Sequence, residues 1–446
     1  MTNVSPWKEA LAASPDPERA AHHLQLVRDA AGDRLNDWGP SAAGLLCLVL
    51  AGSARLATLL AQHPDWLSVV GDVEALQHPR RISSLEREAA RELRPRLEAG
   101  DTRGYLDGLH ELRLRELLRI AARDLGRLGP MEELLLEISH AADFFLAGIF
   151  ELTQRQLTER FGAPWHQDPD GRWHPTRFAV LGMGKLGGQE LNYSSDVDLL
   201  FVYSEEGSTF RGPPKGRKSG TQVLASHQFY KRLCEAFIKE ATARGVQGGG
   251  LRIDLRLRPE GDSGPLARSL DSFENFYAEY GQTWERMMLI KARRVAGDES
   301  IAGEFLEAIQ PFRYPRSLGE GLFREMAEMK ARLEREIVRA GEIDRNVKLG
   351  RGGIREIEFI AQSLQVIHGG RNPFLQTPQT LVALPKLAGY DLLPAGDAAA
   401  LADAYRFLRE VEHRLQMDEH RQTHTLPADG PALNRMARQM NCRDAR

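Results

Sequence analysis

The chain has 446 residues, enough for roughly two or three domains with substantial cores. Its 59 basic and 62 acidic residues give a formal net charge of −3, which argues against the broad basic groove of a template-directed polymerase. The three cysteines lie far apart and match neither a zinc pattern nor a disulfide framework, as expected in a reducing cytoplasm. The longest apolar stretch, Ala42 to Ala54, is too short to span a bilayer and predicts a buried helix. We therefore expect a cytoplasmic protein that binds neither nucleic acid nor membrane.

The first part of the chain is rich in Ala, Leu, Arg and Glu at helical spacing, which predicts a helical region over residues 1–125. Met131 to Phe161 predicts one long helix or two joined helices. The polar stretch Pro164 to Pro175 then predicts a break before the first strand.

The stretch from Phe178 to Tyr203 carries the strongest chemical signal. An apolar run leads into a glycine-rich turn, and Asp196 and Asp198 then open a second apolar run, which predicts strand, tight loop and strand. On a strand these two aspartates point to the same face. Paired carboxylates favour magnesium, with manganese as the alternative, and phosphate oxygens complete such a shell. Gly187 and Gly188 would let a phosphate approach the backbone.

The chain then alternates between loops, a helix and one more strand. Ser204 to Gly220 predicts an exposed loop, Gln222 to Ala243 a helix, and Leu251 to Leu257 a strand that follows a glycine run. That strand would place Asp254, Arg256 and Arg258 on one face, as a third metal-binding carboxylate and two phosphate-facing guanidiniums. The alternative is an exposed edge strand with solvated charges. After about residue 310 the pattern is helical again.

These residues resemble a known superfamily. Gly187-Gly188, Asp196-x-Asp198 and the later Asp254 are similar to the polymerase-β-like nucleotidyltransferases, in which two metals assist nucleotidyl transfer. The longer strings resemble, more specifically, the bacterial bifunctional glutamine synthetase adenylyltransferase/adenylyl-removing enzymes. They read GMGKLGGQELNYSSDVDLLF, LRIDLRLRPEGDSGPL, WERMMLIKAR and KLGRGGIREIEFIAQ, in the family's order.

The resemblance implies an α+β fold that is mostly helical. A nucleotidyltransferase domain with a mixed sheet would span residues 126–310, between helical regions at 1–125 and 311–446. Because the family carries two such domains in tandem, we expect the chain to be a fragment of a longer protein. Met183 and Asn192 stand in the glycine turn and before the aspartates as in the family's N-terminal, adenylyl-removing half.

The implied enzyme is a glutamine synthetase adenylyl-tyrosine phosphorylase. Inorganic phosphate would attack adenylylated glutamine synthetase and release ADP, under regulation by the PII signal protein. The resemblance implies metal binding and catalysis by Asp196, Asp198 and Asp254. Lys185, Arg256 and Arg258 are candidates to hold the phosphate on charge and predicted direction, and Ser195 either bonds a phosphate oxygen or stabilises a turn.

Weaker signals lie further along. The loop Gly350 to Gly353 either meets a phosphate or simply starts a helix, with Glu356 favouring its dipole. Lys291 and Arg293 either reach a nucleotide or form a solvated basic face. The basic loop Arg211 to Lys218 is by default a linker.

Two other functions remain open. One is transfer in the opposite direction, from ATP onto glutamine synthetase, or uridylyl transfer onto PII. The other is a regulatory binding module without activity, against which three intact carboxylates argue.

Overall fold

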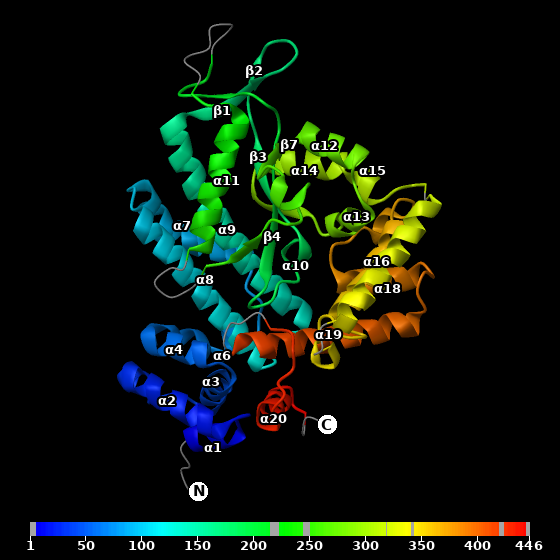
Figure 1. Cartoon of the computed structure of the whole chain (residues 1–446). Coiled ribbons are helices and arrows are strands. Elements are labelled where there is room, and N and C mark those ends of the chain that lie inside the picture. The colour runs from blue at the N-terminus through cyan, green and yellow to red at the C-terminus, as the bar shows by residue number, and fades with distance from the viewer. Residues whose placement is uncertain are drawn as a thin grey trace.

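The computed structural model describes residues 6–214, 223–243, 250–317, 319–339, 343–418 and 423–442. A mixed sheet lies between two groups of helices, with further helices at both ends of the chain (Figure 1). This arrangement confirms the predicted α+β class, mostly helical, with a mixed sheet. The boundaries proposed at residues 125 and 310 stay predictions.

The N-terminal region is helical, as predicted. Its helices are α1 (Pro6–Ala13), α2 (Pro17–Ala31), α3 (Pro40–Gly52), α4 (Ala54–Gln62), α5 (Leu67–Gly71), α6 (Val73–Leu76), α7 (Ile82–Glu98) and α8 (Thr102–Leu125). The apolar stretch after Ala42 forms α3, whose side chains are largely buried among its neighbours. Serine and aspartate side chains cap several of these helices, for example Asp101 at the start of α8.

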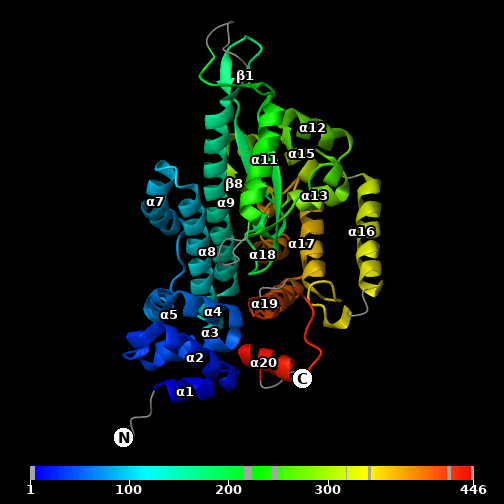
Figure 2. The same cartoon turned by 60° about the vertical axis from the view of Figure 1, so that its left-hand side comes forward.

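The prediction for Met131 to Phe161 is confirmed by one continuous helix, α9 (Met131–Phe161). It packs against α8 on one side and against the sheet on the other (Figure 2). The helix ends at Gly162, whose φ of 81° and close approach to the backbone of Phe210 both require glycine.

The central sheet has the strand order β6-β4-β3-β8. Its strands are β3 (Phe178–Gly182), β4 (Asp196–Tyr203), β6 (Arg252–Asp254), β7 (Ala267–Ser269) and β8 (Arg293–Gly297). β3 pairs antiparallel with both β4 and β8, whereas β6 and β7 pair parallel with successive parts of β4. The predicted strand, turn and strand are therefore β3, the short helix α10 (Gly184–Gly187) and β4.

Alternation along the strands gives this sheet two apolar faces. Val197 and Leu199 of β4 pack toward α9 and α11 (Ser226–Thr242), in the large core cluster. Leu200 and Val202 pack toward α12 (Leu270–Glu279) and α14 (Glu299–Ala308). Asp196 and Asp198 have the parity of Leu200 and Val202, so they open that second face where the strand begins.

Two regions differ from the sequence prediction. The expected break at Pro164 to Pro175 forms a hairpin of β1 (Ala163–Gln167) and β2 (Trp173–Pro175). β5 (Ser208–Phe210), inside the expected loop Ser204 to Gly220, adds a third strand. Pro175 is the last residue of β2, whereas Pro164 is the second residue of β1, where its carbonyl still accepts the N–H of Thr176 at 2.9 Å. Residues 215–218 of the basic loop lie outside the described residues.

The predicted strand Leu251 to Leu257 is wrong after Asp254, where β6 ends. The Asp254 carboxylate accepts the backbone N–H of Arg256 at 2.9 Å, which turns the chain out of the ladder. Arg256 and Arg258 therefore do not continue the polar face of a strand.

The described chain is helical after about residue 310, as predicted, and its helices begin directly after β8 with α14. The helices that follow α14 are α15 (Gln310–Arg313), α16 (Glu320–Arg339), α17 (Ile354–His368), α18 (Thr380–Gly389), α19 (Ala395–Met417) and α20 (Gly430–Gln439), and α13 (Thr283–Leu289) precedes β8. α17, α18 and α19 share a core of their own. α19 passes beneath the end of the sheet where β4 begins (Figure 1).

Candidate functional site

The three predicted carboxylates meet at one end of the sheet, which we call the carboxylate edge: Asp196, Asp198 and Asp254. In the parallel pairing of β4 with β6, Asp198 is the register partner of Asp254. Asp196 lies two residues before Asp198 on the same face. The pairing of neighbouring strands thus brings together residues that are far apart in the sequence.

The electrostatics of this edge shift the pKa values of two of its carboxylates. Burial, and then the charges of Asp254 and Asp196, raise the pKa of Asp198 to about 6, although Lys348 and Arg256 act in the opposite direction. Hydrogen bonds from Arg256 lower the pKa of Asp254 against a smaller effect of burial. Asp198 is therefore the member of the edge whose negative charge is least well compensated.

Two arginines form ion pairs with carboxylates of the edge. Arg252 donates from Nε to Asp196 at 2.8 Å, and Arg256 donates from Nη2 to Asp254 at 2.5 Å. As the described side chains stand, no three acidic, histidine or cysteine residues are arranged to hold a metal ion. The carboxylate oxygens of the three aspartates are nevertheless the kind of ligand that a hard divalent cation prefers. The Arg256 side chain, which is 74% exposed, can leave Asp254 at little cost.

Gly184 is the glycine that faces the carboxylate edge. Its φ of 54° favours glycine, and a Cβ there would collide with the Asp198 carboxylate. The structure places Gly187 against the carbonyl of Lys291, and Gly188 near Glu190 and the carbonyl of Pro378. Their role in phosphate binding stays a prediction, whereas their present contacts are within the protein.

The predicted phosphate-binding cations also contact protein groups. Lys185 lies 2.8 Å from Glu412 of α19, and burial lowers its pKa to about 8 despite that partner. Arg258 is buried and donates to the backbone carbonyl of Leu255 at 2.9 Å. Ser195, directly before Asp196, is half-buried. Of the predicted phosphate ligands, Arg256 pairs directly with a carboxylate of the edge and Ser195 precedes one in the chain.

Lys291 and Arg293 both bind carboxylates of the protein. Lys291 lies 2.8 Å from Glu190 and 2.9 Å from Glu358 of α17. Arg293 donates to Asp143 of α9 at 2.8 Å. Because Lys291 is buried, the solvated basic face is wrong for this residue.

The glycine loop before α17 is a helix start. Glu356 accepts the backbone N–H of Gly352 at 2.7 Å, which confirms the reading that this glutamate stabilises the N-terminus. Lys348 lies just before these glycines, and its charge acts on Asp198, which the sequence did not reveal. Its only signal was its place at the head of the string KLGRGGIREIEF.

Two protein-family models match this chain, one of them over the residues of the carboxylate edge. The family model for glutamate-ammonia ligase adenylyltransferases matches residues 43–308, more than half of the chain, including the carboxylate edge. The chain belongs to this family. A second family model, described as GlnD PII-uridylyltransferase, matches residues 327–446, which hold Lys348 and the C-terminal helices.

Curated relatives from three bacteria are named bifunctional glutamine synthetase adenylyltransferase/adenylyl-removing enzyme. The protein of Thioalkalivibrio sulfidiphilus is 38% identical over 96% of this chain and 42% of its own length. Those of Methylococcus capsulatus and Pseudomonas aeruginosa are each 41% identical, over 77% and 72% of this chain and 35% and 32% of their own lengths. The chain thus spans less than half the length of these relatives. The resemblance stated from the motifs is confirmed, and this family is one of nucleotidyltransferases.

No single helix in the described part of the chain is long and apolar enough to cross a bilayer, and the one pair that qualifies jointly, α3 with α4, is bent by 119°.

Proposed function

We propose that the chain removes AMP from adenylylated glutamine synthetase by phosphorolysis. An oxygen of inorganic phosphate would form a bond to the phosphorus of the adenylyl group as the bond from phosphorus to the tyrosine oxygen breaks. ADP leaves, and the tyrosine oxygen takes a proton from solvent. The observation that carries the proposal is the meeting of Asp196, Asp198 and Asp254 in a member of this family.

The direction of the reaction rests on the motif around the turn. Met183 and Asn192 match the adenylyl-removing half by resemblance, and both are buried. Asn192 accepts a hydrogen bond from Arg409 of α19. These residues therefore act through the packing of the turn rather than at the reacting atoms, and activity measurements must decide the direction.

The site's task is to bring together two anions that repel one another. Asp196, Asp198 and Asp254 would hold magnesium, or manganese in its place, which supplies positive charge to the adenylyl phosphate and to the departing tyrosine oxygen. Phosphate is already anionic at neutral pH, so the site needs no general base. Arg256 would exchange Asp254 for a phosphate oxygen, and Ser195 would donate its hydroxyl to another.

The other predicted phosphate ligands enter the proposal differently. Gly187, Gly188, Lys185 and Arg258 support the turn and the strand end through their contacts with the protein. Their direct contact with phosphate would require them to leave these partners. The protein substrate, glutamine synthetase, and the regulator, PII, are likewise part of the proposal.

The test is release of ADP from adenylylated glutamine synthetase upon addition of phosphate and magnesium. We expect release that depends on both, and its loss in Asp196→Asn. No release by the wild-type chain would refute the proposal. Labelling of unmodified glutamine synthetase from ATP would favour the reverse transfer. Labelling of PII from UTP would favour uridylyl transfer, the activity in the description of the second family model.

A further inference from the structure

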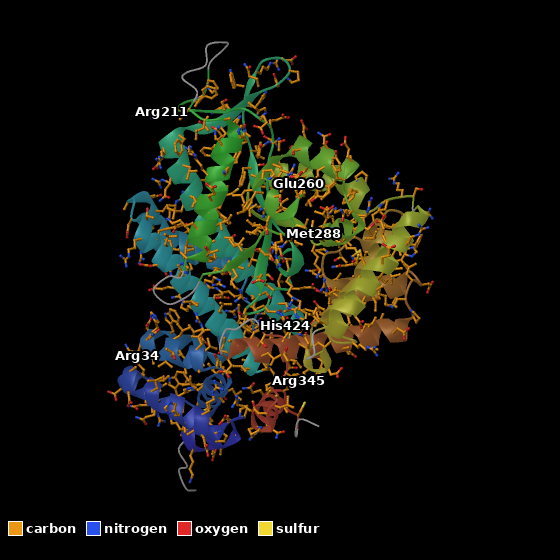
Figure 3. The ribbon with its side chains drawn as sticks, viewed as in Figure 1. Arg34, Arg211, Glu260, Met288, Arg345 and His424 are labelled. Atoms are coloured by element: carbon orange, nitrogen blue, oxygen red, sulfur yellow. The ribbon has the colours of Figure 1, made fainter. Side chains whose placement is uncertain are left out.

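A segment from the C-terminal helices reaches the carboxylate edge through a continuous chain of contacts. The backbone N–H of Val347 donates to the carbonyl of His424 at 2.9 Å, and the His424 ring lies 2.9 Å from Glu412. Glu412 in turn holds Lys185, which follows Gly184 at the Asp198 carboxylate. Figure 3 shows His424 beside α19, on the side of the sheet end. The residue after Val347 is thereby fixed close to the site.

That residue is Lys348, and its backbone is anchored on both sides. Its N–H donates to the Asn346 side chain at 3.0 Å, and its carbonyl accepts from the N–H of Arg355 at 3.1 Å. Gly353 makes the turn tight, because a Cβ there would lie within 3.0 Å of the Lys348 carbonyl oxygen. A half-buried side chain on such a turn has few positions available to it.

The other cations around the carboxylate edge already have partners. They are Lys185 with Glu412, Arg252 with Asp196, Arg256 with Asp254, and Arg258 with backbone carbonyls. Among the described residues, no carboxylate lies within ion-pair distance of the Lys348 ammonium. The loop that carries it is connected to the edge by the contacts from Val347 through His424, Glu412 and Lys185 to the turn at Gly184.

We propose that Lys348 binds a phosphate group of the ligand at the carboxylate edge, so that the C-terminal helices complete the site. The inference rests on the proposed nucleotidyl chemistry and adds a residue to it. An incoming phosphate meets three carboxylates, and a lysine held by the protein offsets that repulsion without reorganisation. The ligand class is a phosphate ester or free phosphate, as in ADP or inorganic phosphate.

The experiment compares wild type with Lys348→Met, Lys348→Arg and the matched control Lys386→Met, a half-buried lysine on α18. Binding of ADP with magnesium is measured by isothermal titration calorimetry, and AMP serves as the ligand with one phosphate fewer. Circular dichroism reports folding. We expect the Kd for ADP to rise about tenfold or more in Lys348→Met, the loss expected for one hydrogen bond to a charged group. Lys348→Arg should stay within about threefold of wild type because it keeps the charge that pairs with phosphate.

A second measurement separates this inference from the proposed function. In phosphorolysis, the KM for inorganic phosphate should rise in Lys348→Met, and Lys386→Met should match wild type. If the wild type binds ADP but releases none from adenylylated glutamine synthetase, the proposed function fails and the Kd values still judge Lys348. An unchanged Kd in Lys348→Met, or no ADP binding by wild type, overturns the inference. If Lys348→Met fails to fold, Lys348→Gln takes its place. The inference is then overturned if Lys348→Gln binds ADP with the same Kd as wild type.

Discussion

Two charged regions lie side by side in this molecule and are built in opposite ways. The carboxylate edge gathers three like charges at a sheet end. Just below it lies a second group, which we call the buried ionic interface: Lys185, Glu190, Lys291, Glu358, Arg409 and Glu412. This interface has three cations for three carboxylates, joined in pairs at 2.8 to 3.1 Å.

The difference shows what each set of charges does. A balanced, buried network joins the glycine turn to α17 and α19, and its cost of burial is repaid only while every partner is present. Like charges held together without full compensation weaken the fold, and such a cluster is typical of a site whose ligand neutralises it. Charge balance, rather than residue type, therefore separates the structural cations from the candidate catalytic groups.

Breaking the buried ionic interface should give the largest loss of stability. Lys291→Met leaves Glu190 and Glu358 buried without their shared cation, and we expect a loss of about 3–5 kcal/mol in the free energy of unfolding. Urea denaturation followed by circular dichroism measures it. Adding Glu190→Gln and Glu358→Gln to Lys291→Met should recover most of that loss, because no unpaired charge then remains. A loss below about 1 kcal/mol in the single variant would show that the interface does not hold the fold.

Neutralising the carboxylate edge should give the reverse pattern. Asp198→Asn and Asp254→Asn should each lower the rate of ADP release about a hundredfold or more, as loss of a group that stabilises the transition state does. Because Asp198→Asn removes a buried, repelled charge, it should leave the free energy of unfolding unchanged or raise it by about 1–3 kcal/mol. Asp403→Asn, an exposed aspartate on α19, is the matched control and should behave as wild type. A destabilised, fully active Asp198→Asn would assign this residue to the fold instead.

The sequence predicts the edge better than the interface, for a physical reason. The two-residue alternation of Asp196 and Asp198 fixes their face on a strand, and family resemblance brings in Asp254. Lys185 and Lys291 carry no such signal, because their partners Glu412 and Glu358 lie 227 and 67 residues further along. A cation in a glycine-rich motif therefore suggests phosphate binding until its buried partner is seen.

The errors in the fold have a similar origin. Local pattern predicted the long helix α9 because its apolar spacing continues without a break. It missed β1 and β2, whose short strands are stabilised by pairing with each other and with β5. It also extended β6 beyond Asp254, because alternation in the sequence does not show that a side chain will bond the backbone and turn the chain.

The two regions should also respond to pH with opposite signs. For Asp198, measured without metal in EDTA, the folded pKa of about 6 lies above the unfolded value of about 3.9. The folded state then binds the proton more tightly, so this residue adds stability as pH falls through 6. The unfolding free energy of wild type minus that of Asp198→Asn should rise by up to about 3 kcal/mol between pH 7 and pH 4.

Glu358 should do the reverse. Burial raises its pKa, but Lys291 and Lys185 outweigh burial and lower it to about 2. Its contribution is present above the unfolded value of about 4.3 and is lost as pH falls toward 2. The unfolding free energy of wild type minus that of Glu358→Gln should therefore fall as the pH is lowered, whereas the same signed difference for Asp198→Asn should rise. Parallel slopes for the two differences would contradict the contrast between edge and interface.

Lys185 gives the smallest expected effect and the sharpest test of the boundary between the two regions. Glu412 keeps Arg409 and His424 when Lys185 is removed, so Lys185→Met should cost about 1–3 kcal/mol of stability rather than more. If this lysine belongs to the interface, the KM for phosphate should change less than about twofold, since a group that does not contact the ligand contributes no binding energy. If Lys185 leaves Glu412 to hold phosphate, as its motif predicts, that KM should rise with little loss of stability. Measured beside Lys348→Met, the two variants show which lysine the phosphate meets: one should change the free energy of unfolding and the other the affinity for the anion.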